Sequence, residues 1–189
     1  MNLSSADLED LRRLLCRMQE ETRDQLVRTR DANPLEELSR VVEVGLEERD
    51  PVLLPEGTAP DSIQLCCIID PIDGTRSLMY DKRSAWVLSG IAPHPSSRAR
   101  LCDISIAAMT EIPTAKQRLA DQVSAIRGLG PRGIRAERVD LDTKQRRPAG
   151  TRPSTATDLR GGFASFARFF PEAKGLLAEF EESLWNRLY

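Results

Sequence analysis

Apolar residues spaced three and four apart near the start of the chain predict an amphipathic helix from Ser4 to Arg30. The expected buried stripe consists of Leu8, Leu11, Leu15, Met18 and Thr22. Ser4 or Ser5 can cap the first turn, because a short hydroxyl side chain accepts a hydrogen bond from a backbone amide there. The remaining positions are heavily charged, so the apolar stripe should pack against the rest of the domain.

A series of apolar runs separated by turn-forming residues predicts a group of strands further along the chain. The runs are Ile63–Ile69, Trp86–Ala92, Asp103–Met109, Leu119–Ile126 and Ile134–Leu141. The first is apolar apart from Gln64 and stops at Asp70-Pro71, so we expect it inside a sheet, with both faces covered. Short links between consecutive strands are typical of antiparallel pairing.

The other segments complete an α+β fold of helices packed on a mostly antiparallel sheet. Residues 35–49 fit either a short helix or a strand ending at Gly45, and residues 50–61 form a proline-rich loop. We expect an N-terminal α+β domain over 1–142, and a basic exposed loop and C-terminal helical segment over 143–189. The final helix, from about Glu172 to Leu188, should bury Leu176, Leu177, Phe180, Leu184 and Trp185.

Composition and charge narrow the classes of partner. The 189 residues include 27 Lys and Arg against 29 Asp and Glu, a net charge of −2 that argues against binding nucleic acid by bulk electrostatics. No apolar run approaches the length needed to span a bilayer, and the first residues lack the features of a signal peptide, so we expect a cytoplasmic protein. Four cysteines without a CxxC pair and a single histidine indicate reduced thiols rather than a zinc site.

The segment Asp70-Pro71-Ile72-Asp73-Gly74-Thr75 carries the candidate chemistry. A tight turn alone would explain Pro71 and the Asp73-Gly74 pair, but not two carboxylates and a hydroxyl at the end of a buried strand. Converging carboxylates repel one another unless they share a proton or bind a cation. Carboxylate and carbonyl oxygens suit Mg²⁺, and the amides of Gly74 and Thr75 could face a phosphate. The pattern therefore favours metal-assisted hydrolysis of a phosphoester.

The segment Cys67–Leu78 resembles the first signature of the inositol monophosphatase family, a strand followed by D-P-[IL]-D-G-T. This family belongs to the Mg²⁺-dependent, lithium-sensitive phosphatase superfamily that includes fructose-1,6-bisphosphatase. The stretch Asp81–Ala92 fits the connector and strand that follow in the family, and the resemblance extends over roughly residues 45–111. It implies a fold like the N-terminal part of the sugar phosphatase α/β/α/β/α layered fold.

The resemblance also implies a role for each residue of the motif. Asp70 and Asp73 would be metal ligands, and Ile72 would contribute its backbone carbonyl. Gly74 and Thr75 would bind the substrate phosphate through their amides, and the Thr75 hydroxyl would orient the attacking water.

Two features of the family have no clean match in this chain. The first is an upstream Gly-Glu-Glu-type motif, whose glutamate binds metal and activates water. The candidates for it are Glu43, Glu47, Glu48 and Asp50. Glu47 is favoured because it follows a glycine at nearly the expected separation. The second is a W-D-x-x-A/G signature with a further metal-binding aspartate; here Trp86 precedes a valine and Trp185 an asparagine.

The implied protein is a Mg²⁺-dependent phosphomonoesterase that hydrolyses a small phosphorylated polyol, sugar or nucleotide with a metal-activated water. The alternative is a truncated or catalytically incomplete phosphatase-like module with weak metal or anion binding, and an unrelated α+β binding domain is a third reading. Because the chain resembles the N-terminal portion only, we expect weak Mg²⁺ binding and poor hydrolysis. We also expect exposed apolar surface near Phe163–Phe170 or Leu176–Trp185, which would favour a homo-oligomer.

Overall fold

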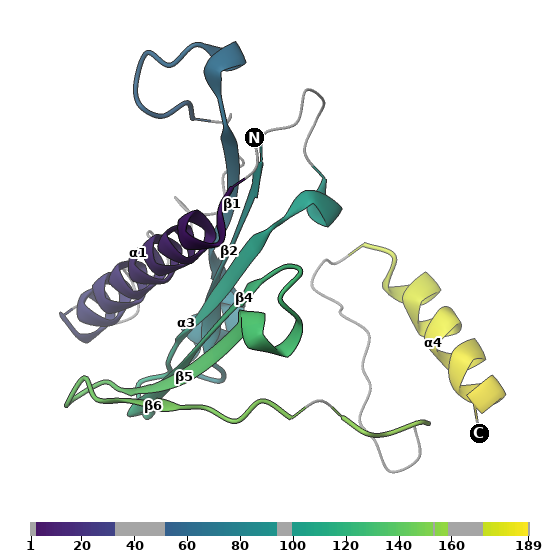
Figure 1. Ribbon diagram of the computed structural model, residues 1–189. Coiled ribbons are helices and arrows are strands. Elements are labelled where there is room, and N and C mark those ends of the chain that lie inside the picture. Colours follow the sequence, from purple (N-terminus) through teal and green to yellow (C-terminus); the bar gives the residue numbers. More distant parts are fainter. Residues whose placement is uncertain (1–2, 33–51, 94–99, 153, 159–171, 189) are drawn as a thin grey trace. The chain divides into compact units, whose positions relative to one another are not determined.

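The computed structural model describes residues 3–32, 52–93, 100–152, 154–158 and 172–188 (Figure 1). The chain divides into two compact units, residues 1–150 and 151–189. The first contains a long helix and a six-stranded antiparallel sheet, which confirms the expected α+β class. Within the described ranges, no helix is both long and apolar enough to cross a membrane.

Helix α1 spans Ser5–Ala32 and begins with a reciprocal cap. The Asp7 amide donates to Ser4 Oγ at 3.2 Å, and the Ser4 amide donates to Asp7 Oδ2 at 2.9 Å. These contacts satisfy backbone donors that have no acceptor within the helix. The hydrogen bonds from the Ser4 side chain and amide hold the pKa of Asp7 below its usual value. The predicted helix is therefore confirmed, with its cap at Ser4.

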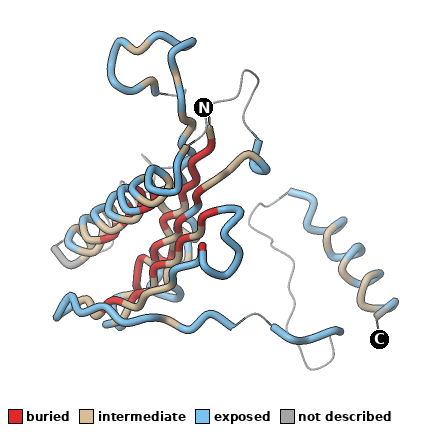
Figure 2. Tube along the Cα trace, in the orientation of Figure 1, coloured by how far each residue is buried: buried red, intermediate tan, exposed pale blue. Residues whose placement is uncertain are grey.

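The buried face of α1 differs from the predicted stripe. Leu15 is buried in the main apolar cluster, with Leu8 and Leu11 packed against it, as expected. Met18, however, is 43% exposed, whereas Gln19 and Arg23 are buried. Figure 2 shows the buried residues concentrated along the central strands of the sheet. The apolar periodicity misplaced this end of the stripe because the sheet presents polar side chains to the helix here. Gln19 donates to Ser89 Oγ and accepts from the Thr110 hydroxyl.

The six strands follow one another in space in their sequence order, and every neighbouring pair is antiparallel. They are β1 (Leu65–Asp73), β2 (Ala85–Pro93), β3 (Ile106–Ile112), β4 (Leu119–Ile126), β5 (Ile134–Asp140) and β6 (Arg146–Pro148). Short elements join them: η1 (Pro60–Ser62), α3 (Thr75–Met79), η2 (Leu101–Asp103) and η3 (Gly130–Gly133). Helix α1 lies across one face and contacts β2, β3 and β4 (Figure 1).

Strand β1 exists close to its predicted bounds, but the prediction of an interior strand is wrong for the described part of the chain. Here β1 pairs with β2 alone and forms an edge. Ile68 is 60% exposed and Ile69 is 47% exposed. Helix α1 contacts mainly β2 to β4, and Leu65, at the start of β1, packs against the buried cluster around Leu15. The strand also continues through Pro71 to Asp73, rather than stopping at Asp70. Proline is tolerated on an edge strand, where a missing amide donor leaves no ladder bond broken.

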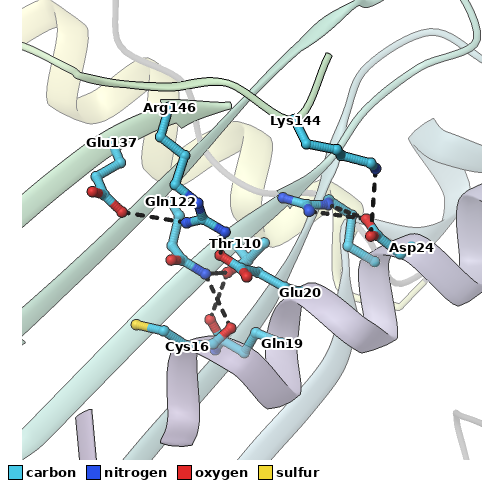
Figure 3. Close-up of polar contacts among 10 residues, drawn as sticks. Cys16, Gln19, Glu20, Asp24, Thr110, Gln122, Glu137, Lys144 and Arg146 are labelled. Atoms are coloured by element: carbon cyan, nitrogen blue, oxygen red, sulfur yellow. Dashed lines mark hydrogen bonds and ion pairs between the residues drawn. The ribbon is translucent and has the colours of Figure 1, made fainter. Parts of the chain in front are cut away.

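The basic stretch 143–154 is not simply a loop, as the sequence predicted, because it contains the short strand β6. A turn joins β5 to β6, and in it the Thr143 amide donates to Asp140 Oδ1 at 3.0 Å. This bond and an ion pair with Arg118 lower the pKa of Asp140 to about 2. Beyond the turn, the Arg146 guanidinium lies 2.6 Å from the Glu20 carboxylate of α1 (Figure 3). Backbone pairing with β5 and charge pairing with the helix therefore hold this short, exposed strand in place.

The second unit contains α4 (Lys174–Leu188), close to the predicted final helix. Leu176 and Phe180 are exposed rather than buried, whereas Leu177, Leu184 and Trp185 are partly buried. Exposed apolar surface on this helix agrees with the expectation for a small segment that has little core of its own. The predictions for Leu35–Arg49 and Phe163–Phe170 lie outside the described residues.

Candidate metal and phosphate site

A β-bulge places the two candidate aspartates on one face of the sheet. Asp70 pairs with Leu88 and Asp73 with Trp86, so three steps along β1 match two steps along β2. Leu88 and Trp86 are two residues apart and share a face, and residues directly opposite in an antiparallel pair point to the same side. The extra residue in β1 therefore brings Asp70 and Asp73 to the same side, whereas a regular strand would separate them.

The side chains on either side of the aspartates anchor this turn in the core. Ile72 packs against a buried cluster of Leu78, Ala85, Val87 and Ile112. Leu78 belongs to α3 and is 4% exposed, so the segments before and after Gly74 are both attached to the same cluster. The motif is therefore held by packing on the core side, while Asp70 and Asp73 remain exposed.

Gly74 makes the reversal between β1 and α3. Its φ is +91°, a left-handed conformation that L-residues with a side chain adopt only with strain. The amides of Ser77 and Leu78 both donate to the Gly74 carbonyl, at 3.1 and 3.2 Å. The glycine is thus required by the backbone conformation, and it sits where the resemblance implied a close approach to phosphate.

The Thr75 hydroxyl donates to the Ile72 carbonyl oxygen at 2.6 Å. This bond fixes the hydroxyl proton, so the oxygen lone pairs remain available to accept a hydrogen bond from a water or substrate donor. The carbonyl also has a second lone pair, which leaves it able to serve as a ligand. Asp70 Oδ1 accepts from the Ile72 amide at 3.1 Å, which orients that carboxylate within the bulge.

The donor set at the turn fits a hard cation in its chemistry. Asp70 and Asp73 supply carboxylate oxygens and Ile72 a carbonyl oxygen, which Mg²⁺ prefers over nitrogen or sulfur. Residues 3–32, 52–93, 100–152, 154–158 and 172–188 contain no cluster of three or more His, Cys, Asp or Glu side chains able to hold a metal. The upstream candidates Glu43, Glu47, Glu48 and Asp50 lie outside these residues. That one of these four residues supplies an acidic metal ligand therefore stays a prediction.

A second polar region was not predicted from the sequence. Arg146 and its basic neighbours were expected in an exposed loop, but Arg146 lines a cavity between α1 and the sheet, together with Arg12, Arg13 and Arg17. The available signal was the helical spacing of Arg13 and Arg17, which places both on one side of α1. The position of β6 beside these arginines depends on the order of strands in the sheet, which could not be predicted from the sequence.

Comparison with known proteins gives a likeness in structure only. No protein-family model matches the chain, and no curated protein matches it. The crystal structure of Leishmania major fructose-1,6-bisphosphatase in holo form matches 79% of this chain and 54% of its own, with a TM-score of 0.54 and 10% identity. The apo form matches 80% of this chain and 53% of its own, with a TM-score of 0.48 and 10% identity.

This likeness shows a shared α+β fold. The chain spans about half the length of the bisphosphatase chain that it matches.

Proposed function

We propose that the chain is the part of a Mg²⁺-dependent phosphomonoesterase that contributes its metal-binding turn. The proposed substrate is a small phosphorylated polyol, sugar or nucleotide. The observation that carries the proposal is the bulge, which sets Asp70 and Asp73 on one face immediately before the Gly74 turn. The fold shared with a fructose-1,6-bisphosphatase supports this class of enzyme, and the D-P-I-D-G-T resemblance supports the inositol monophosphatase type.

In this proposal, Asp70, Asp73 and the Ile72 carbonyl hold Mg²⁺, and Glu47 completes the ligand set. Bound Mg²⁺ would activate water and stabilise charge on the leaving oxygen. The Thr75 hydroxyl, held by Ile72, accepts a hydrogen bond from the attacking water and so orients it. The amides of Gly74 and Thr75 donate to the phosphate of the substrate.

A catalytically incomplete module is the second candidate, and one observation favours it. The described turn supplies two carboxylates, and Mg²⁺ retains water when protein ligands are few. Such a module would bind Mg²⁺ or an anion weakly without turnover.

The two candidates are separated by measuring binding and hydrolysis on the same preparations. Mg²⁺ binding is measured by calorimetry, and hydrolysis with a panel of sugar and inositol phosphates, with and without lithium. Asp73→Asn removes one carboxylate at the turn, and Asp61→Asn, an exposed position in η1, is the matched control.

Lithium-sensitive turnover that disappears in Asp73→Asn and persists in Asp61→Asn would support the enzyme. Mg²⁺ binding that depends on Asp73 without turnover would support the incomplete module. Equal Mg²⁺ binding by both variants would refute the metal site itself.

A further inference from the structure

A cavity of about 480 Å³ lies between the N-terminal half of α1 and strands β4, β5 and β6. We call it the arginine cavity, because its lining includes Arg12, Arg13, Arg17, Arg135 and Arg146. A volume of this size is within the range of roughly 300–1,000 Å³ that small-molecule sites occupy. Figure 3 shows one side of it, where Arg146 reaches from β6 toward α1.

Most of these guanidinium groups already have a carboxylate partner. Arg146 lies 2.6 Å from Glu20 and 3.3 Å from Glu137. Arg12 and Arg135 both contact Glu9, and the hydrogen bond from Arg12 is the main cause that lowers the pKa of Glu9. These pairs make the cavity wall a built structure rather than a set of mobile surface side chains.

Arg17 is different, because its side chain makes no hydrogen bond or ion pair with any residue that the structure describes. Arg13, one turn earlier, makes only long contacts, 3.5 Å to Glu9 and 3.7 Å to Asp10, and its side chain is 64% exposed. Long, exposed ion pairs contribute little, so Arg13 can turn toward a better acceptor without much loss. The pair Arg13 and Arg17 is therefore the available cationic part of the cavity.

The lining as a whole favours an anion. Five arginines face three carboxylates, Asp10, Glu20 and Glu137, and counting Glu9 beside them still leaves one positive charge in excess. The thiol of Cys16 also faces the cavity, and desolvation by burial raises its pKa. The thiol therefore stays neutral near pH 7 and does not repel an anion. Ser124, 5% exposed, adds a hydroxyl on the sheet side.

We propose that the arginine cavity binds the phosphate group of a small phosphorylated molecule through Arg17 and Arg13. The planar guanidinium fork matches the geometry of phosphate oxygens and forms charge-assisted hydrogen bonds with them. The site is separate from the Asp70–Thr75 turn. The turn lies on edge strand β1, whereas the cavity is formed by β4 to β6 at the other side of the sheet. The proposal therefore does not depend on the proposed function.

The test is a titration of the full chain with inorganic phosphate, followed by amide chemical shifts in a ¹H–¹⁵N spectrum. EDTA is present, so that no divalent cation can recruit phosphate to the Asp70–Thr75 turn, and chloride keeps the ionic strength constant. Arg17→Gln removes the available guanidinium. Arg28→Gln, an exposed position further along α1 and outside the cavity, makes the same change in net charge.

We expect saturable shifts at Cys16, Arg17 and Ser124. Arg17→Gln should weaken the apparent affinity about tenfold, the effect of losing one strong charge-assisted contact. Arg28→Gln should change the affinity less than about twofold, because screening reduces the effect of a distant charge. An absence of saturable shifts, shifts confined to the Asp70–Thr75 turn, or equal weakening by the two variants would each overturn the proposal.

Discussion

A buried chain of amide and hydroxyl side chains joins α1 to the sheet, and we predict that breaking it destabilises the first unit strongly. Gln19 is 2% exposed and donates to Ser89 Oγ at 2.5 Å and to the Ala108 carbonyl at 2.9 Å. Its Oε1 accepts from the Thr110 hydroxyl at 2.8 Å. Thr110 in turn accepts from Gln122 at 2.8 Å (Figure 3).

The perturbation is Gln19→Met, which keeps the length of the side chain and removes its polar atoms. Each lost hydrogen bond is worth about 0.5–1.5 kcal/mol net, and a buried polar group left without a partner adds about 1–3 kcal/mol. Three bonds are lost, and the fully buried Thr110 hydroxyl loses its acceptor. We therefore expect the free energy of unfolding to fall by at least about 2.5 kcal/mol, which is the sum of the lower limits.

The assay is urea unfolding followed by the fluorescence of Trp86, in a Trp185→Phe background, so that the signal comes from the first unit. Gln25→Met, an exposed position on the same helix, is the matched control and should change stability by less than about 0.5 kcal/mol.

The double variant Gln19→Met with Thr110→Val removes both partners of the central bond. It should lose at least about 1 kcal/mol less than the sum of the single variants, because no unpaired hydroxyl remains. A Gln19→Met variant as stable as the Gln25→Met control, or strictly additive single variants, would refute the reasoning.

Three further predictions address the turns and β6. The pKa of Asp140 is lowered to about 2 in the folded protein, chiefly by the Thr143 amide, so the stability that its carboxylate contributes is present above the unfolded pKa and is lost as pH falls through about 2. Asp140→Asn should therefore be less stable than wild type at pH 6, and the difference should shrink as pH falls through about 2; a constant difference would contradict the linkage. Gly74→Ala should lower the free energy of unfolding by about 1–2 kcal/mol, because alanine is strained at the left-handed φ of this position. Urea unfolding measures this loss, and an unchanged midpoint would contradict it. Arg146→Met removes the pair with Glu20 and should speed amide exchange in β6, which unchanged protection would disprove.

The sequence predicted the elements well wherever periodicity and turn residues agree. Strand β4 has its predicted bounds, Leu119–Ile126, and its residues alternate in burial, although two of the buried ones, Gln122 and Ser124, are polar. Strand β3 begins three residues later than the run Asp103–Met109, because Leu101–Asp103 form a 3₁₀ turn stabilised by the Arg100 amide donating to Asp103. Local side chain–backbone bonds of this kind compete with strand pairing at element ends.

The sequence could not show which element packs against each face of a helix or strand. An apolar run such as Ile63–Ile69 predicts a strand but not its position in the sheet, and β1 is an edge among the described residues. Similarly, Gln19 interrupts an apolar stripe, and the polar side chains of Ser89 on β2 and Thr110 on β3 explain why it is buried. The identity of one residue does not reveal which residue, seventy or more positions away in the chain, will pack against it.

At the candidate site, the sequence allowed two interpretations, a tight turn or a pair of metal ligands, and the observed backbone has features relevant to each. Gly74 supplies the left-handed residue that the turn requires. The extra residue between Asp70 and Asp73 is what brings the two carboxylates to one face. A turn needs no second carboxylate on that face, where like charges repel one another. In the proposed metal site, a bound cation would turn this repulsion into attraction.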